Sequence, residues 1–442
     1  MTDVIVVGSG PSGVNAAAPL VEAGRRVLML DYGVEDRRYT PLIPHRPFSE
    51  LRRTDPQQHR YFLGDRFEGI SFGQVRVGAQ LTPPRMHVLA EAAERMPVHS
   101  DTFAASMSLA RGGLGAAWSA GVFPFTDDEL HDMSLGLADL RPHYDAVAER
   151  IGVCGEHDDL ERFFPASSSM MPALEIDSNA ETIPLRYEPK RSELHAAGFF
   201  LGRPRLAACT RRHRERGPHA YLDMCDWADL DQSVYRPQWT LKELQRSPNF
   251  SYLGRRFVHA FTERDGGLQV HATNADTGAD ESHEARALVL GAGTLGTARI
   301  VLRSLDRYDT VVPLLCNPYA YVPTLNMGML GRPARDRRYT LAQLTAILSV
   351  RGVPGRIVQA QVFSYRSLLT FKLMKESPLP YREALRILRV LIPKLAIMGI
   401  HHEDRPSPRQ VLRAPAGRAR RRGPPRDRVS PRPGRDTHAG GR

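Results

Sequence analysis

A short glycine-rich segment near the N-terminus has the residues and spacing of a phosphate-binding loop. It reads Gly8-Ser9-Gly10-Pro11-Ser12-Gly13 and follows a β-branched run that predicts a buried strand over residues 3–7. The first glycine permits a tight turn, the second lets the backbone approach a pyrophosphate, and the third lets a helix pack on the strand. The helix N-terminus adds free N–H groups and a partial positive charge. These residues predict dinucleotide binding.

An acidic residue stands where a dinucleotide would need one. The pattern predicts a helix over residues 14–23 and a second strand over residues 26–31. Asp31 ends that strand 18 residues after Gly13, where its carboxylate can accept hydrogen bonds from ribose hydroxyls. Tyr32 follows it and is assigned to the same site. The alternative, a glycine turn without a ligand, would leave the agreement of strand, glycines, helix and acid unexplained.

Two further glycine-rich segments lie later in the chain. The first, Gly112-Gly113-Leu114-Gly115 with Trp118 after it, would let backbone lie close to a flat ring system, although a surface loop is the alternative. The second, Gly291-Ala292-Gly293-Thr294-Leu295-Gly296, lies between a strand predicted over 285–290 and a helix predicted over 297–304. A hairpin is predicted before it, with strands over 257–263 and 268–273.

In three segments the sequence resembles the glucose–methanol–choline family of FAD-dependent oxidoreductases. They are residues 4–33, 109–121 and 288–299, although the family more often has glutamate at the position of Asp31. The resemblance implies that the first segment binds FAD, the second lies against the flavin and the third returns the chain to the FAD domain. It also implies that the backbone of Val258 faces the adenine. The implied FAD contacts are Gly8, Ser9, Gly10, Pro11, Ser12, Gly13, Asp31, Tyr32, Gly112, Gly113, Leu114, Gly115, Trp118, Val258, Gly291, Ala292 and Gly293.

The predicted fold class is α/β, with a three-layer, Rossmann-like FAD-binding domain and a discontinuous α+β substrate domain. A chain of 442 residues is too long for one compact core. We expect the FAD-binding domain to comprise residues 1–140 and 241–305, the substrate domain residues 141–240 and 306–405, and a disordered Arg/Pro/Gly tail residues 406–442. Helices are expected over 137–151 and over 381–400, the second kinked at Pro393.

The resemblance implies oxidation of a small-molecule alcohol, in which a histidine near the C-terminus removes the hydroxyl proton while hydride passes to the flavin. No segment of that kind follows His401-His402, which we interpret as a solvated or helix-capping pair. Beyond them only His438 occurs, in the tail. The tail has the composition of a GC-rich gene read out of frame, so we expect a truncated or frameshifted, inactive chain. Catalytic residues therefore stay unassigned.

The net charge of +11 belongs to the tail. Residues 405–442 hold 12 arginines and two acidic residues, a net +10, so the rest of the chain carries only +1. Residues 414–442 contain no aromatic residue and one large aliphatic residue, Val429, which predicts disorder. A neutral body and a tail without aromatic residues argue against nucleic-acid binding, although such arginines can hold phosphates by charge alone.

Other function classes find less support in the sequence. Four widely spaced cysteines form no CxxC pair, so neither a metal site nor a redox disulfide is expected, and a cytoplasmic location is predicted. No transmembrane segment is expected, and residues 381–400 leave peripheral membrane contact as an alternative to a domain-edge helix. Residues 291–296 also allow a flavoprotein that takes electrons from NAD(P)H, but no clear following strand carries a ribose-binding acid.

Overall fold

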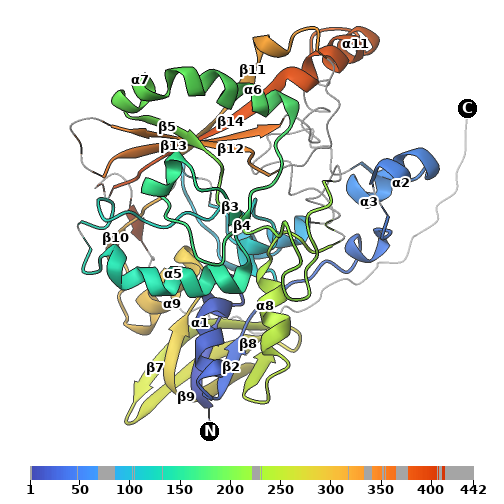
Figure 1. The fold of residues 1–442 in the computed structure, drawn as a ribbon. Coiled ribbons are helices and arrows are strands. Elements are labelled where there is room, and N and C mark those ends of the chain that lie inside the picture. Colours follow the sequence, from blue (N-terminus) through green and yellow to red (C-terminus); the bar gives the residue numbers. More distant parts are fainter. Residues whose placement is uncertain are drawn as a thin grey trace, which may run out of the picture.

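The computed structural model describes residues 2–413, except for residues 47, 68–84, 102, 104, 132, 222–228, 230, 317, 333–340, 351–352, 354, 365–376, 406 and 408–410. Two large sheets dominate the described chain, one at each end of the molecule in Figure 1, and a core of loops and short elements lies between them. The predicted tail from residue 414 onward, Cys225 and His438 lie outside the described residues.

The six-stranded sheet contains the two strands that lead into the glycine segments 8–13 and 291–296. Its strand order is β6-β2-β1-β9-β8-β7. The bounds are β1 Thr2–Val7, β2 Val27–Leu30, β6 Phe250–Leu253, β7 Arg256–Arg264, β8 Gly267–Asn274 and β9 Asp280–Leu290. Strands β6, β2, β1 and β9 run parallel, whereas β7, β8 and β9 form an antiparallel meander. Strand β9 belongs to both groups, because its first half pairs with β8 and its second half with β1.

Alternation along β1 separates the two faces of this sheet. Val4 and Val6 pack against α1 (Pro11–Glu22) and α8 (Pro237–Leu244). Ile5 and Val7 pack on the other side against the meander and against Ile300 of α9 (Thr294–Ser304). Helices, parallel strands and meander therefore form three layers, and the predicted α/β, Rossmann-like fold class is confirmed.

The five-stranded sheet is antiparallel throughout, in the order β11-β14-β13-β12-β5. Its outer face is covered by α6 (Ser178–Tyr187) and α7 (Arg191–Ala196), which lie across the sheet in Figure 1. Residues from two distant stretches build it, since β5 comes long before the other four strands. The bounds are β5 Phe199–Gly202, β11 Tyr319–Leu325, β12 Leu344–Ser349, β13 Ile357–Ser364 and β14 Leu395–His402.

The helix predicted over residues 381–400 is wrong in its second half. Helix α11 covers Tyr381–Leu391, a 3-10 turn covers Ile392–Lys394, and the chain then becomes β14. Pro393 ends the helix rather than kinking it, and β14 gains hydrogen-bonded neighbours on both sides, β11 and β13. His401 and His402 therefore end a strand and cap no helix. Partial burial lowers the pKa of His401 below its usual value.

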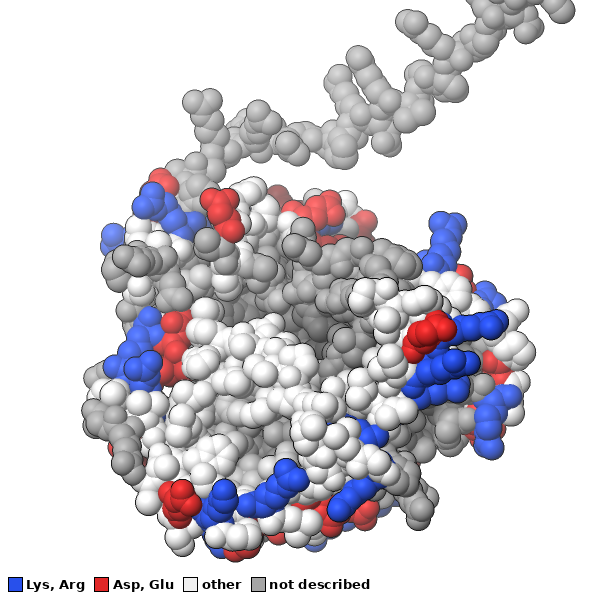
Figure 2. Space-filling model, turned by 90° about the horizontal axis from the view of Figure 1, so that it is seen from above, with Lys and Arg blue, Asp and Glu red and all other residues white. Residues whose placement is uncertain are grey.

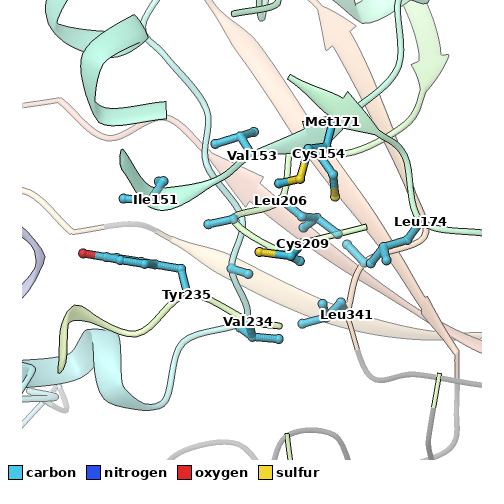
Figure 3. Packing of buried hydrophobic residues seen from close by; sticks show 14 residues of the cluster. Ile151, Val153, Cys154, Met171, Leu174, Leu206, Cys209, Val234, Tyr235 and Leu341 are labelled. Atoms are coloured by element: carbon cyan, nitrogen blue, oxygen red, sulfur yellow. The ribbon is translucent and has the colours of Figure 1, made fainter. Parts of the chain in front are cut away.

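A third core lies between the two sheets in Figure 1 and is drawn from close by in Figure 3. It gathers the end of α5 (Leu137–Ile151), the short parallel pair β3 (Cys154–Gly155) and β4 (Met171–Pro172), and the segment Leu206–Cys209. Helix α5 has the bounds that the sequence predicted. Cys154 and Cys209 are buried here as free thiols, and burial raises the pKa of Cys154 to about 12, so the thiol is inert.

The remaining elements are short. None of the described helices is long and apolar enough to cross a membrane. The short elements are α2 Phe48–Thr54, α3 His59–Phe62, α4 Ala92–Arg95 and the antiparallel pair β10 Val311–Pro313 with β15 Val411–Arg413.

Candidate functional site

A cavity of about 260 Å³ lies at the carboxyl ends of β1, β2 and β9, where α1 and α9 begin. This is the edge of a parallel sheet at which open α/β folds bind their ligands. Most of the predicted site residues line it. They are Gly8, Ser9, Gly10, Pro11, Ser12, Asp31, Tyr32, Gly113, Leu114, Val258, Gly291, Ala292 and Gly293.

The first and third glycine segments are in direct contact. Gly8 has a φ of +96°, and a Cβ built on it would lie 2.5 Å from the carbonyl oxygen of Gly291. A Cβ on Gly13 would overlap the carbonyl oxygen of Gly8. Gly10 differs, because the nearest atom to its Cβ would be the Gly291 oxygen at 4.0 Å, so its open side faces the cavity. The two outer glycines thus serve backbone packing, while the middle one leaves room for a ligand.

The second glycine segment closes over the first. A Cβ on Gly113 would lie 3.3 Å from the Cα of Gly10. The backbone N–H of Gly112 donates to Oγ of Ser9 at 2.8 Å. Segments about a hundred residues apart in sequence are therefore joined at one hydrogen bond and one backbone contact beside the cavity.

Asp31 lies on the cavity wall and is already hydrogen-bonded by the protein. Its carboxylate accepts from Oγ of Ser9 at 2.5 Å, from the backbone N–H of Ser9 at 3.3 Å and from the hydroxyl of Tyr252 at 2.9 Å. Burial raises the pKa of Asp31, and the hydrogen bonds from Ser9 and Tyr252 act against that rise. These bonds hold the carboxylate in one orientation. Oδ2 accepts two of them, and Oδ1 accepts only the bond from the backbone of Ser9.

Four predicted residues do not line the cavity. Gly13 and Gly112 lie just behind it, and a Cβ on Gly112 would meet the side chain of Gln238 at 2.7 Å. Gly115 is wedged between the rings of Pro11 and Pro237. The indole of Trp118 donates to the carbonyl oxygen of Tyr235 at 2.7 Å and packs on the central core.

An arginine that the sequence analysis did not assign is part of the cavity wall. Nη2 of Arg299 donates to the carbonyl oxygen of Val258 at 2.8 Å, and its guanidinium lies 4.6 Å from the ring centre of Phe257. Nε of Arg299 is buried without a hydrogen-bond partner, and burial lowers the pKa to about 10. The side chain remains a cation at neutral pH. Arg299 lies in the segment 288–299 that carries the resemblance, which was a signal. Its contacts with Val258 and Phe257 of β7 come from the packing of α9 on the meander, which the sequence does not show.

The cavity can hold phosphates without a metal ion. Helices α1 and α9 both begin at it, and their N-caps, Gly10 and Gly293, provide no side-chain hydrogen bond to the first-turn N–H groups. Such helix ends attract anions. Among residues 2–413 as described, no cluster of three His, Cys, Asp or Glu side chains is close enough to hold a metal.

The residues present fit the adenosine diphosphate half of FAD. A glycine cradle, two uncapped helix ends, Asp31 and the backbone of Val258 lie around one space. Its volume lies just under the range of about 300–1,000 Å³ typical of ligand pockets, so a whole dinucleotide would extend beyond it. Leu114, which lines the cavity, is 46% exposed.

Comparisons with known proteins add little to this geometry. No protein-family model and no curated protein matches the chain. Among solved structures, it is similar to the crystal structure of pyridoxine 4-oxidase from Mesorbium loti, with 14% sequence identity and a TM-score of 0.45, over 91% of this chain and 71% of that one. At those values the similarity assigns neither a family nor an activity.

Proposed function

We propose that this protein is an FAD-dependent oxidoreductase of the glucose–methanol–choline type, acting on the CH–OH group of a small alcohol. The observation that carries the proposal is the meeting of three glycine segments, residues 8–13, 112–115 and 291–296, around one cavity beside Asp31. A single dinucleotide-binding fold accounts for residues 8–13 and 291–296. Residues 112–115 are accounted for by a flat ring system that the backbone must approach closely.

Each part of the adenosine diphosphate half of the cofactor has a counterpart in this arrangement. Gly10 and the N-terminus of α1 would hold the pyrophosphate, Asp31 would accept from ribose hydroxyls, and the backbone of Val258 would face the adenine. Arg299 adds a positive charge within the same wall. When bound, FAD supplies the acceptor for a hydride from the carbon that carries the hydroxyl.

The described cavity wall provides no residue for the proton. Its titratable side chains are Asp31, Tyr32, Arg256 and Arg299, and no histidine, lysine or cysteine is among them. Asp31 already accepts hydrogen bonds from Ser9 and Tyr252, and the hydroxyl of Tyr32 donates to Glu91. Because this wall would hold the adenosine diphosphate half of FAD, the group that takes the hydroxyl proton belongs beside the flavin, outside this cavity.

The visible spectrum of the purified protein tests this function. We expect flavin absorbance, release of FAD on denaturation, and fading of that absorbance when a primary or secondary alcohol is added without oxygen. A yellow protein that no such alcohol bleaches would overturn the activity on CH–OH groups, in agreement with the inactive chain that the sequence predicts, and would leave FAD binding in place. A colourless protein that takes up no added FAD would overturn the cofactor assignment.

The second candidate is a flavoprotein that takes electrons from NAD(P)H. It is based on the glycine segment 291–296, at which α9 begins. Residues 291–296 line the same cavity as residues 8–12, so the described residues give them no separate nucleotide to bind. Rapid fading of the flavin on adding NADPH, but not on adding alcohols, would favour this candidate.

A further inference from the structure

A second cavity, of about 380 Å³, lies between α5 and the segment that follows the glycine loop, residues 121–124. No described residue lines both this cavity and the dinucleotide cavity. Its volume is within the range of pockets that hold small molecules. Apolar side chains form most of the wall, among them Val122, Phe123, Val147, Ile151 and Met170.

One fully buried cation, Arg205, is part of this wall. The residue is 3% exposed, and its Nε has no hydrogen-bond partner. Its other nitrogens make only long hydrogen bonds, from Nη1 to the carbonyl oxygen of Arg203 at 3.4 Å and from Nη2 to that of Phe164 at 3.3 Å. A buried guanidinium with such weak partners is unfavourable, because it has lost its water without gaining equivalent contacts.

Asp158, the acid that pairs with Arg205, makes no close ion pair with it. Oδ1 of Asp158 is 4.0 Å from Nη2 of Arg205, at the limit of an ion pair. Both carboxylate oxygens of Asp158 already accept backbone hydrogen bonds, from Leu160 and Arg203. Burial accordingly lowers the pKa of Arg205, because desolvation outweighs the attraction of Asp158. Arg205 therefore retains capacity for another anion.

The guanidinium lies close to the cavity. A Cβ built on Gly155 would be 3.0 Å from Nη1 of Arg205 and 2.9 Å from the sulfur of Met170, which also lines the cavity. The other charged residues of the wall are Arg141 and Asp145, whose side chains pair at 3.3 Å. The wall thus carries a net charge of +1, located on Arg205.

We propose that this cavity binds an amphipathic monocarboxylate, such as a medium-chain fatty acid. The carboxylate would lie on the guanidinium of Arg205, which presents donors that match a carboxylate in pairs. The hydrocarbon chain would lie between α5 and residues 121–124, against Val122, Val147 and Ile151. Apolar walls exclude a polyanion such as a nucleotide, whose further charges would find no partner.

Titration calorimetry with octanoate, octanol and acetate tests the proposal on the full chain. We expect octanoate to bind at least about tenfold more tightly than octanol, which lacks the charge, and than acetate, which lacks the chain; tenfold corresponds to about 1.4 kcal/mol. Equal affinity for octanoate and octanol would overturn the role of Arg205. Equal affinity for octanoate and acetate would overturn the role of the apolar wall.

Two alanines on α5 provide a matched pair of variants. Ala148 lines the cavity, and Ala146 is exposed on the other side of the helix. Ala148→Phe fills the cavity and should weaken octanoate binding at least tenfold, while Ala146→Phe should bind like the parent. Unchanged binding by Ala148→Phe, with circular dichroism showing a folded chain, would contradict the proposal.

Arg205→Met tests the charge directly. We expect this variant to lose its preference for octanoate over octanol while still binding octanol. If it does not fold, the two alanine variants decide the question. These measurements need no flavin, so a negative result would leave the proposed cofactor and reaction standing, and a colourless protein would leave this cavity standing.

Discussion

The position of Asp31 at the cavity follows from the sequence, but its hydrogen-bond donors do not. It lies at the cavity, as predicted, but Ser9 and Tyr252 donate to its carboxylate. Tyr252 comes from β6, 221 residues later, and reaches Asp31 because β6 lies beside β2 in the parallel sheet. The protein therefore orients this carboxylate before any ribose is present.

Removing the Tyr252 hydroxyl tests that orientation. Tyr252→Phe should lower the free energy of unfolding at neutral pH by about 1–2 kcal/mol, because a buried carboxylate loses one of its donors. Denaturant unfolding measures the change. Tyr308→Phe is the control, since Tyr308 is exposed and such surface changes stay within about 0.5 kcal/mol. Equal stability of the two variants would show that Asp31 does not depend on Tyr252.

A bidentate ion pair beside the cavity predicts a pH dependence. Nε and Nη2 of Arg256 contact the two carboxylate oxygens of Glu281 at 2.9 and 3.0 Å, and these hydrogen bonds hold the pKa of Glu281 at about 2. A folded-state pKa below the unfolded value of 4.5 means that the pair stabilises the fold above pH 4.5 and loses this effect as pH falls toward 2.

The variant Glu281→Gln should therefore be less stable than the parent at pH 7, by about 1 kcal/mol for a partly exposed pair. The difference should shrink steadily between pH 5 and about pH 2. Urea unfolding across that range measures it. A difference that stays constant with pH would mean that the ionised carboxylate is not what stabilises the fold.

Among the elements, those with a local pattern were predictable. The first strand, helix and second strand, the hairpin and α5 follow from glycine positions, alternation and helical spacing. Strand β14 was not predictable, because Leu395–His402 becomes a strand only through pairing with β11 and β13. The hydrogen bond of Trp118 was not predictable for a similar reason, since its acceptor, the carbonyl oxygen of Tyr235, lies in a segment without regular structure.

In the turn between β1 and α1, Gly13 is needed for backbone packing, whereas Gly10 is expected to serve binding. Gly13→Ala should destabilise the fold by about 3 kcal/mol, because its methyl group would overlap backbone of Gly8 that cannot move aside without disturbing Gly291. Gly10→Ala should leave stability within about 0.5 kcal/mol, because its φ of −64° suits alanine and no atom lies closer than 4.0 Å.

Binding should respond in the opposite way. Gly10→Ala should weaken FAD binding at least about tenfold, since its methyl group projects into the space for the pyrophosphate. Thermal unfolding and flavin fluorescence titration measure the two effects separately. If Gly10→Ala bound FAD like the parent, the pyrophosphate would not lie over this turn.

For the whole molecule, the distribution of charge matters more than its sum. Figure 2 shows basic and acidic side chains interspersed around one face of the described chain, in keeping with a body whose net charge is only +1. Described structure ends with β15, Val411–Arg413, which pairs with β10. A deletion that begins at Ala414 therefore leaves that pair in place.

Deleting residues 414–442 should leave the melting temperature unchanged, because this segment has one large aliphatic residue and no aromatic residue to bury. Flavin absorbance should also be unchanged. Elution from a heparin column should move to lower salt, because most of the arginines of the tail are lost. A large fall in melting temperature would show that the segment packs on the body.

The pairing of β1 with β9 sets a time at which the cofactor site can first exist. Thr2 lies beside Ala285 and Val7 beside Leu290, so the first strand made must wait for a partner made much later. During synthesis on the ribosome, the phosphate loop emerges early, but its wall at Gly291 follows only after about two thirds of the chain. Until then the cavity lacks this wall, so binding of the proposed FAD would follow translation of this late strand.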